Sequence, residues 1–350
     1  MLKVKINSLL DYIQPTKYIV SSEEYSNEFN TPVLTAGDTF LLGYTNDKDG
    51  IYNASKHNPI ILFDDFTTAI KWVDFPFKVK SSACKIIVSK TKTNLRYCYY
   101  AMKAMNFDHS QHKRYWISEY SEQLINDYED ENSKIVAELD NITDTISKKE
   151  QVILNLDELI KSRFIEMFSE YEKVDLSTLA DIIMGQSPNS KSYNDDGNGM
   201  PFFQGKGDYG DKVAVVAHWT TEPTKVVEAN VVLMSVRAPV GPVNFSPVKC
   251  CLGRGLCGIN AKSGKTNNEF LYNALIAIQD EISGKGNGST FSSITKKDVY
   301  EIKIPNAPID IMNKFSELSQ QIDKSKFIVQ KEIKDLQELL DKKMDEYFGQ

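Results

Sequence analysis

Residues 134–168 read KIVAELDNITDTISKKEQVILNLDELIKSRFIEMF, and residues 314–348 read KFSELSQQIDKSKFIVQKEIKDLQELLDKKMDEYF. Neither segment contains glycine or proline, and apolar residues recur in both at spacings of three and four. This spacing is typical of a helix whose apolar stripe packs against another helix. The stripe positions are Ile135, Leu139, Ile142, Ile146, Ile153, Leu156 and Ile160 in the first segment and Ile322, Val329, Ile333, Leu336 and Leu340 in the second.

The two segments end two halves of a duplicated chain. They match at an offset of 180 residues, and VKINSLLDYI at residues 4–13 resembles VDLSTLADII at residues 174–183 at an offset of 170. A repeat this long is a duplicated domain, because solenoid periods are roughly 20 to 50 residues. The order is therefore globular, helix, globular, helix, and the globular halves have diverged further than the helices.

The globular halves show short β-rich runs between turns rich in Gly, Pro, Asn and Asp. We expect strands at 59–63, 85–88, 213–216 and 231–234 and a helix over 267–282. The sequence thus predicts an α+β protein with two mixed α/β domains and two long helices that pair as an antiparallel, pseudo-twofold coiled coil. The expected boundaries are 1–118 and 174–305 for the domains and 119–173 and 306–350 for the helices. The alternative is that each helix packs separately on its own globular half.

The net charge of −7 is unevenly distributed. The first globular half carries a net +4 and the second 0, whereas the helical segments carry −9 and −2. Binding to phosphates requires Lys and Arg. The charge therefore permits nucleic-acid binding by the globular halves without demonstrating it.

The composition, with 41% hydrophobic and 25% charged residues, is that of a soluble globular protein. No apolar run reaches the roughly 18 residues of a membrane span, and the N-terminus has no signal-peptide pattern. The five cysteines are odd in number and lack C-x-x-C spacing, which favours buried free thiols in a reducing compartment. We expect a cytoplasmic protein with no membrane contact.

Several short sequence motifs occur in the two globular halves, most of them in the second. They are GQSP at 185–188, SVRAPVG at 235–241, GRG at 253–255, GSTFSSI at 288–294 and IKIP at 302–305, with TPVL at 31–34 and HKRYWIS at 112–118 in the first half. Together with the duplication, they resemble the specificity (S) subunits of type I restriction–modification systems. The first half departs from the pattern, because it has FDDF at 63–66 and SSAC at 81–84 in place of the SVRAP and GRG strings.

The resemblance implies a DNA-binding subunit that recognises a bipartite sequence in double-stranded DNA. Each target-recognition domain would bind one half-site, and the paired helices would set the gap between half-sites. A rigid connection of fixed length admits one half-site spacing. The resemblance also implies two methyltransferase (M) subunits docked on the helices and, in complexes that cleave DNA, restriction (R) subunits. S-adenosylmethionine, and ATP with Mg²⁺, would be bound by those partners.

Basic and hydroxyl side chains within these strings are the candidates for DNA contact. Arginine suits bidentate hydrogen bonding to guanine and phosphate, so Arg237 and Arg254 either contact DNA or brace loops of their domain. Tyr115 and Trp116, next to two basic residues, are as consistent with a core aromatic pair as with base contact. The full candidate set is Lys113, Arg114, Lys206, Arg237, Arg254, Ser289, Thr290, Lys296 and Lys297.

No catalytic constellation is complete in the sequence. SGKT at 263–266 resembles the end of a P-loop, but Ile259 stands where the first glycine belongs. The four histidines show no metal-ligand spacing. We therefore expect no catalytic residue, metal site or intrinsic cofactor. Two alternatives stay open: a coiled-coil adaptor that binds only proteins, and a methyltransferase or nuclease with an unrecognised site.

Overall fold

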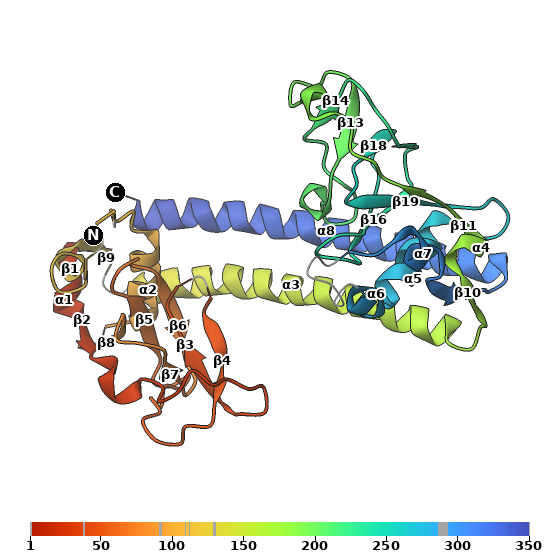
Figure 1. Ribbon diagram of the computed structural model, residues 1–350. Helices are drawn as coiled ribbons and strands as arrows, with labels where there is room; N and C mark the ends of the chain where they lie inside the picture. Colours follow the sequence, from red (N-terminus) through yellow and green to blue (C-terminus); the bar gives the residue numbers. More distant parts are fainter. Residues whose placement is uncertain are drawn as a thin grey trace. The chain divides into compact units, whose positions relative to one another are not determined.

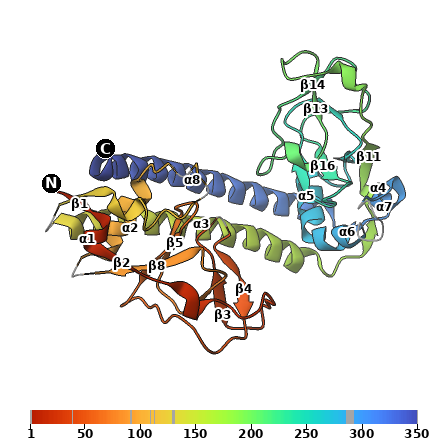
Figure 2. The ribbon, with the colours of Figure 1, turned by 60° about the vertical axis from the view of Figure 1, so that its left-hand side comes forward.

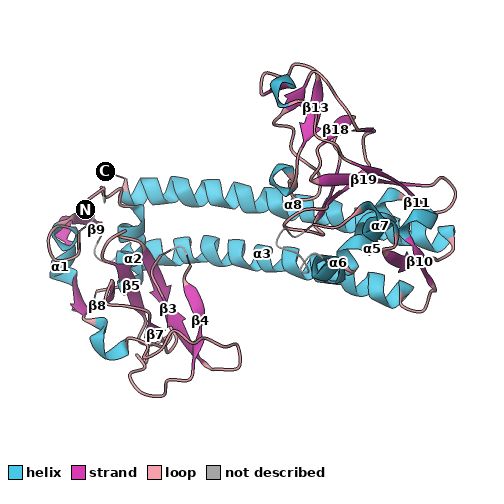
Figure 3. Cartoon of the chain, in the orientation of Figure 1, coloured by secondary structure: helices cyan, strands magenta, loops and turns pink. Residues whose placement is uncertain are grey.

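The computed structural model of the chain describes residues 2–37, 39–90, 93–108, 110–111, 113–128, 131–285 and 293–349. The chain forms two compact units, one of Met1–Lys148 with Glu332–Gln350 and one of Lys149–Lys331. Each unit joins one globular domain to parts of both long helices, which are coloured yellow-green and blue in Figure 1. This mixed α/β content, with long helices and strands gathered in the globular domains, is visible in Figure 3.

The first unit contains an antiparallel four-stranded sheet in the order β2-β8-β5-β6. A three-stranded sheet has the order β4-β3-β7, and β1 pairs with β9. The strands are β1 (Leu2–Lys5), β2 (Leu10–Ile13), β3 (Thr31–Leu34), β4 (Leu41–Thr45), β5 (Ile60–Asp64), β6 (Ile70–Val73), β7 (Lys78–Val79), β8 (Cys84–Ser89) and β9 (Leu124–Asp127). The helices are α1 (Ile6–Leu9) and α2 (Leu95–Ala104), with 3-10 turns at Pro15–Tyr18 and Tyr120–Glu122.

The second unit repeats this plan. Its four-stranded sheet has the order β11-β19-β16-β17, its second sheet the order β12-β14-β13-β18-β15, and β10 pairs with β20. The strands are β10 (Lys173–Asp175), β11 (Ala180–Met184), β12 (Tyr193–Asn194), β13 (Met200–Phe203), β14 (Trp219–Thr220), β15 (Val226–Val227), β16 (Val232–Ser235), β17 (Val243–Phe245), β18 (Cys250–Leu252), β19 (Leu256–Ala261) and β20 (Lys303–Pro305). The helices are α4 (Leu176–Leu179), α5 (Asn268–Ala277), α6 (Gln279–Lys285) and α7 (Lys296–Tyr300), with 3-10 turns at Ser190–Ser192 and Lys206–Asp208.

The two four-stranded sheets have the same topology, strand for strand. In both sheets one inner strand, β8 or β19, pairs antiparallel with its two neighbours. The helix that follows this strand, α2 or α5, begins at an asparagine cap. The caps are Asn94 and Asn267, whose side chains accept backbone N–H groups of the first turn. The duplication expected from the sequence is therefore present in the fold.

The two long helices are α3 (Asn132–Phe168) and α8 (Ile309–Phe348). α8 follows Pro308, whose ring suits a helix start, and ends before Gly349, whose N–H donates to the Asp345 carbonyl at 2.8 Å. α3 covers the apolar-stripe segment 134–168 and is shorter at both ends than the helical segment 119–173 expected from the sequence.

Within each unit, α3 and α8 contact each other, and Figures 1 and 2 show these parts side by side. In the first unit Lys343 forms an ion pair with Glu138 at 3.1 Å, and in the second Lys326 forms one with Asp157 at 2.6 Å. All twelve stripe positions are buried or half-buried. The buried ones are Ile135, Leu139, Ile142, Ile146, Ile322 and Leu340, and the half-buried ones are Ile153, Leu156, Ile160, Val329, Ile333 and Leu336.

Aromatic side chains dominate the cores next to these helices. Phe164 and Phe168 on α3 pack against Phe315 on α8 with ring centroids 5.3 and 5.5 Å apart. Phe270 of α5 joins them, so the second domain and its helices share one core. All five cysteines are buried and free, as expected, and burial raises the pKa of Cys257 to about 12.

Three expectations from the sequence are wrong. Residues 213–216 form no regular strand, because their pairing with the sheet is limited to an isolated bridge between Val213 and Phe245 in the described part of the chain. The helix expected over 267–282 is two helices, since α5 ends at Ala277 and α6 begins at Gln279. Residues 119–128, assigned to the central helix, instead form a 3-10 turn and the strand β9, which pairs with β1.

None of the helices that the structure describes is both long and apolar enough to cross a membrane.

Candidate nucleic-acid interface

An open groove of about 750 Å³ lies on the second globular domain. Three of the strings singled out in the sequence meet there, namely GQSP at 185–188, the start of SVRAPVG at 235–238 and the end of GRG at 254–255. They lie at the ends of β11 and β16 and just before the start of β19, and these three strands are neighbours in the antiparallel sheet. Lys206, in the 3-10 turn after β13, completes the lining.

Glycines form the floor of this groove because backbones approach closely there. A Cβ added to Gly185 would lie 2.1 Å from the Gly253 carbonyl oxygen, and one added to Gly255 would lie 2.3 Å from that of Gln204. The same segments are hydrogen bonded, since the Gly185 N–H donates to the Leu256 carbonyl at 2.9 Å and the Gly253 N–H to the Phe203 carbonyl at 2.8 Å. The glycines therefore allow the backbone segments to pack closely, and the side chains of the residues between them face the groove.

Three cations line the groove: Lys206, Arg237 and Arg254. All three side chains are exposed, and none forms an ion pair or hydrogen bond with another side chain in the described part of the chain. The backbone N–H of Arg254 donates to the Ser187 hydroxyl at 3.2 Å. Such side chains are free to bind an anionic or bidentate ligand such as DNA phosphate or guanine.

Sequence reasoning missed the neutral polar residues of the groove. Gln186 and Gln204 line it beside the cations, with Ser187, Ser190 and Tyr193. Glutamine can form a bidentate pair with adenine, and serine can contact any base. The GQSP string contains Gln186 and Ser187 and could have pointed to them. Its glycine and proline, however, indicate only a turn.

Two further candidates of the second half, Lys296 and Lys297, do not line the groove. Lys296 and Lys297 belong to α7, where Lys296 lies over the Tyr300 ring at 5.0 Å and Lys297 pairs with Glu301 at 3.8 Å. Ser289 and Thr290 lie outside the described residues.

In the first domain, Lys113 and Arg114 are both paired within the domain. Lys113 pairs with Glu119. Arg114 donates to the Ser82 carbonyl at 3.2 Å and lies 3.7 Å from the buried Asp65 carboxylate. Tyr115 and Trp116 are buried, which supports their interpretation as a core aromatic pair over that as a base contact.

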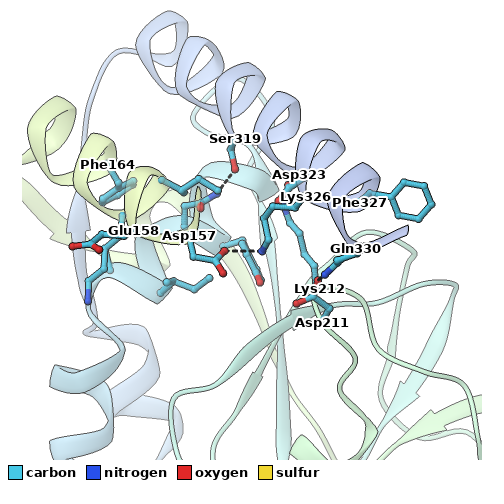
Figure 4. Close-up of a pocket in the computed structure, with 16 residues that line it drawn as sticks. Asp157, Glu158, Phe164, Asp211, Lys212, Ser319, Asp323, Lys326, Phe327 and Gln330 are labelled. Atoms are coloured by element: carbon cyan, nitrogen blue, oxygen red, sulfur yellow. Dashed lines mark hydrogen bonds and ion pairs between the residues drawn. The ribbon is translucent and has the colours of Figure 1, made fainter. Parts of the chain in front are cut away.

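A second cavity, of about 670 Å³, lies between α3, α5, α8 and the loop at Asp211 and Lys212 in the second unit (Figure 4). Its walls combine charged and apolar side chains, and Asp157 and Lys326 form an ion pair across it. Phe327, at its rim, is 69% exposed. Further exposed apolar residues on the helices of this unit are Val152, Leu154, Leu159, Ile165 and Ile328.

The described residues contain no cluster of three His, Cys, Asp or Glu side chains that could hold a metal ion. The SGKT string forms the turn between β19 and α5, where Gly264 has a φ of +75°. Its Thr266 is buried, so the string is a tight turn with no phosphate cradle.

A family model described as the type I restriction modification DNA specificity domain matches residues 169–344. The specificity subunit of the Escherichia coli type I restriction enzyme EcoR124I/EcoR124II is 32% identical over 360 residues, which cover 91% of this chain and 87% of that protein. The chain belongs to the type I specificity subunit family. A putative MjaX specificity subunit from Methanocaldococcus jannaschii is 37% identical over 209 residues, 55% of this chain and 49% of that one.

Solved structures of this family share the fold. The S subunit from M. genitalium superposes with a TM-score of 0.62 at 16% identity, covering 99% of this chain and 96% of that one. A chain from a study of assembly and conformational transition of the type I R-M system gives a TM-score of 0.60 at 22% identity, covering 99% and 97%. These likenesses show that the chain has the fold of solved type I R-M S subunits.

Proposed function

We propose that this specificity subunit recognises a bipartite double-stranded DNA target, with one half-site bound by each globular domain. The observation that carries the proposal is the groove of the second domain, which displays three unpaired cations and two glutamines on a glycine-rich floor. The first domain has the same sheet topology, so a second contact of the same kind is expected there. Cations bind the phosphates, and directed side chains discriminate the bases.

The gap between half-sites is set, in this proposal, by α3 and α8 paired as an antiparallel coiled coil. Two contacts support it: in the first unit Glu138, early in α3, forms an ion pair with Lys343, late in α8, and in the second unit Phe168, the last residue of α3, packs against Phe315 near the start of α8. The apolar stripe positions, none of them exposed, support it as well.

Two methyltransferase subunits would dock on these helices and carry out the chemistry. The exposed apolar side chains of the second unit, among them Leu154, Phe327 and Ile328, support such docking. Exposed apolar patches of this kind mark protein interaction sites. The subunit itself would be non-catalytic, with S-adenosylmethionine and, where restriction subunits are present, ATP and Mg²⁺ bound by the partners.

The test is to co-express the chain with the methyltransferase subunit of its own system and to sequence the methylated genomic sites. The expected result is one gapped sequence with two half-sites. Deleting one heptad from each helix, Lys148–Leu154 and Ile328–Lys334, should remove about 10 Å of helix. At about 3.4 Å per base pair, the preferred gap should shorten by roughly three base pairs while the half-sites stay the same.

Each competing function predicts a different result. A protein-binding adaptor would show no methylation specificity and no DNA binding at low salt. An enzyme would methylate or cleave DNA as the isolated chain when S-adenosylmethionine or Mg²⁺ is added. A continuous methylated sequence without a gap would refute the bipartite proposal.

A further inference from the structure

In the second unit, α8 carries a polar stripe beside its apolar one. Phe315 faces α3, whereas Ser319, Asp323 and Gln330 face the second globular domain and the loop at Lys212 (Figure 4). Ser319 is buried to 1% exposure. The polar residues repeat at spacings of four and seven, so they form one face of the helix.

Lys212 is the centre of the contacts made by this polar face. Its Nζ forms an ion pair with Glu269 of α5 at 2.6 Å and a second ion pair with Asp323 of α8. The ammonium also lies over the rings of Phe245 and Tyr272, at 5.5 and 5.1 Å. One side chain therefore joins the sheet, the domain helix and the long helix.

Glu269 accepts hydrogen bonds from several directions. Its Oε1 accepts from the Ser319 hydroxyl at 2.7 Å and from Asn273 Nδ2 at 3.1 Å, in addition to the Lys212 ion pair. Asn273 also donates to Ser319 at 3.2 Å. We call Lys212, Glu269, Asn273, Ser319 and Asp323 the second docking network.

The backbone of Lys212 is fixed to the recognition sheet. The Phe245 N–H donates to the Lys212 carbonyl at 2.9 Å, and the Ala214 N–H donates to the Phe245 carbonyl at 2.9 Å. Phe245 ends β17, which pairs with β16, and β16 ends two residues before Arg237 in the groove. A continuous hydrogen-bonded path thus connects α8 to the groove.

The first unit has a network at the corresponding place. Arg96 of α2 forms an ion pair with Asp140 of α3 at 2.7 Å, and the Tyr100 hydroxyl donates to Asp140 at 2.6 Å. Arg96 and Glu269 are each the second residue of their helix, and Tyr100 and Asn273 are each the sixth. We call Arg96, Tyr100 and Asp140 the first docking network. The two networks use opposite charges on the domain helix.

We propose that the two docking networks are positioning devices that fix the rotation and register of each domain on its long helix, and so restrict the subunit to one half-site gap. Apolar contacts tolerate small shifts, whereas a charged, multiply bonded network is satisfied in one arrangement only. Moving a domain by one residue along a helix would turn it by about 100°. This inference rests on the proposed bipartite recognition.

The test uses the subunit in complex with its methyltransferase and a DNA library in which the two half-sites are separated by gaps of varied length. Lys212→Met removes both ion pairs but keeps the aliphatic stem over the two rings. We expect the same half-site bases and increased methylation at gaps one base pair shorter and longer, relative to the preferred gap. The expected increase is about tenfold, which corresponds to about 1.4 kcal/mol.

Two further variants serve as controls, and a third repeats the test at an ion-pair partner of Lys212. Lys212→Arg keeps the charge and should restore the narrow gap profile. Lys249→Met breaks an exposed ion pair with Glu228 of the same domain, at 2.7 Å, and should leave the profile unchanged. Asp323→Asn removes one of the two ion pairs. It should also increase methylation at gaps one base pair shorter and longer than the preferred gap. It replaces Lys212→Met if that variant aggregates.

The outcomes separate this inference from the proposed function. An unchanged gap profile in Lys212→Met and Asp323→Asn, or a uniform loss of methylation at all gaps, would overturn the positioning role while bipartite recognition stands. Altered half-site bases would overturn it as well. A wild-type complex that shows no gap preference would instead overturn the proposed function, and this inference with it.

Discussion

In the second domain the N–H of Val236 donates to the Gly255 carbonyl at 2.9 Å, and in the first domain the N–H of Asp65 donates to the Ala83 carbonyl at 2.8 Å. Both bonds follow the same antiparallel register of the two central strands. A later segment of each domain extends this pattern, since the Ile294 N–H donates to the Val236 carbonyl at 3.0 Å and the Tyr115 N–H donates to the Asp65 carbonyl at 2.8 Å. The two domains therefore share the backbone under the groove.

The side chains on this shared backbone differ. The register places Phe66 where the second domain has Arg237, and the turn at Ser81 and Ser82 where it has Arg254. Arg114, which precedes Tyr115, lies over the Phe66 ring at 5.6 Å. The duplicated scaffold thus conserves hydrogen bonding while the displayed residues change, as expected if each domain recognises its own sequence.

The residues below the surface differ as well. Val236 and Cys257 of the second domain are apolar and buried, whereas the first domain has Asp65 and Lys85 at these positions, paired at 3.4 Å with each side chain at most 2% exposed. Asp65 also accepts the Trp116 N–H at 2.8 Å. The first domain therefore depends on a buried ion pair where the second depends on apolar packing.

The largest expected effect follows from this pair. Asp65→Ala removes the carboxylate partner of the buried Lys85, which keeps a hydrogen bond to Gln14 Oε1 at 3.0 Å, and should lower the free energy of unfolding of the first unit by about 3–5 kcal/mol. Val236→Ala should cost only about 2 kcal/mol in the second unit. Calorimetry on the methyltransferase complex measures both. The double variant Asp65→Val with Lys85→Cys should regain most of the loss, and a double variant as unstable as Asp65→Ala would contradict this account.

The next effect tests the glycine floor. Gly255→Ala brings a Cβ to within 2.3 Å of the Gln204 carbonyl oxygen and should destabilise the second unit by about 1–3 kcal/mol. At the equivalent position the first domain has Ala83. There the turn that leads into β8 is longer by one residue than the turn that leads into β19. Gly207→Ala, with no neighbouring atom within 4 Å, is the matched control and should melt as wild type. Equal melting of both variants would show that close approach does not explain the glycine.

The sequence predicts the helices better than the site, for a physical reason. A heptad stripe is a local pattern, so the stripe segment 134–168 identified nearly all of α3, and apolar runs such as 231–234 identified central strands. The segment 119–128 was misassigned because β9 is stabilised by pairing with β1, more than a hundred residues away. Lys113 and Arg114 gave no sign of their internal partners, since Glu119, Ser82 and Asp65 are brought to them only by the fold.

A third effect, on DNA binding, compares Arg254 with Arg114. Arg254→Ala removes an unpaired exposed guanidinium, so it should leave the melting temperature unchanged, relax one position of one half-site and cost about 1–3 kcal/mol there. Arg114→Ala removes hydrogen bonds to Ser82 and should lower the stability of the first unit by about 1 kcal/mol. Binding selections on randomised half-sites, with melting curves, measure both. Arg254→Ala acting equally on all sequences would exclude a base contact.

The smallest expected effect compares two lysines. Lys206 lines the groove and has no ion-pair partner among the described residues, whereas Lys113 pairs with Glu119, which raises its pKa through their hydrogen bond. A lysine already paired has little net charge to offer a phosphate. Lys206→Ala should therefore weaken binding to all sequences alike and reduce the slope of log affinity against log salt by about 1. Lys113→Ala should change neither measurably, because exposed ion pairs contribute little and removing this one also frees the Glu119 charge. Titrations at several salt concentrations decide between them, and a larger salt effect for Lys113→Ala would mean that the first domain binds phosphate through the segment around Lys113 after all.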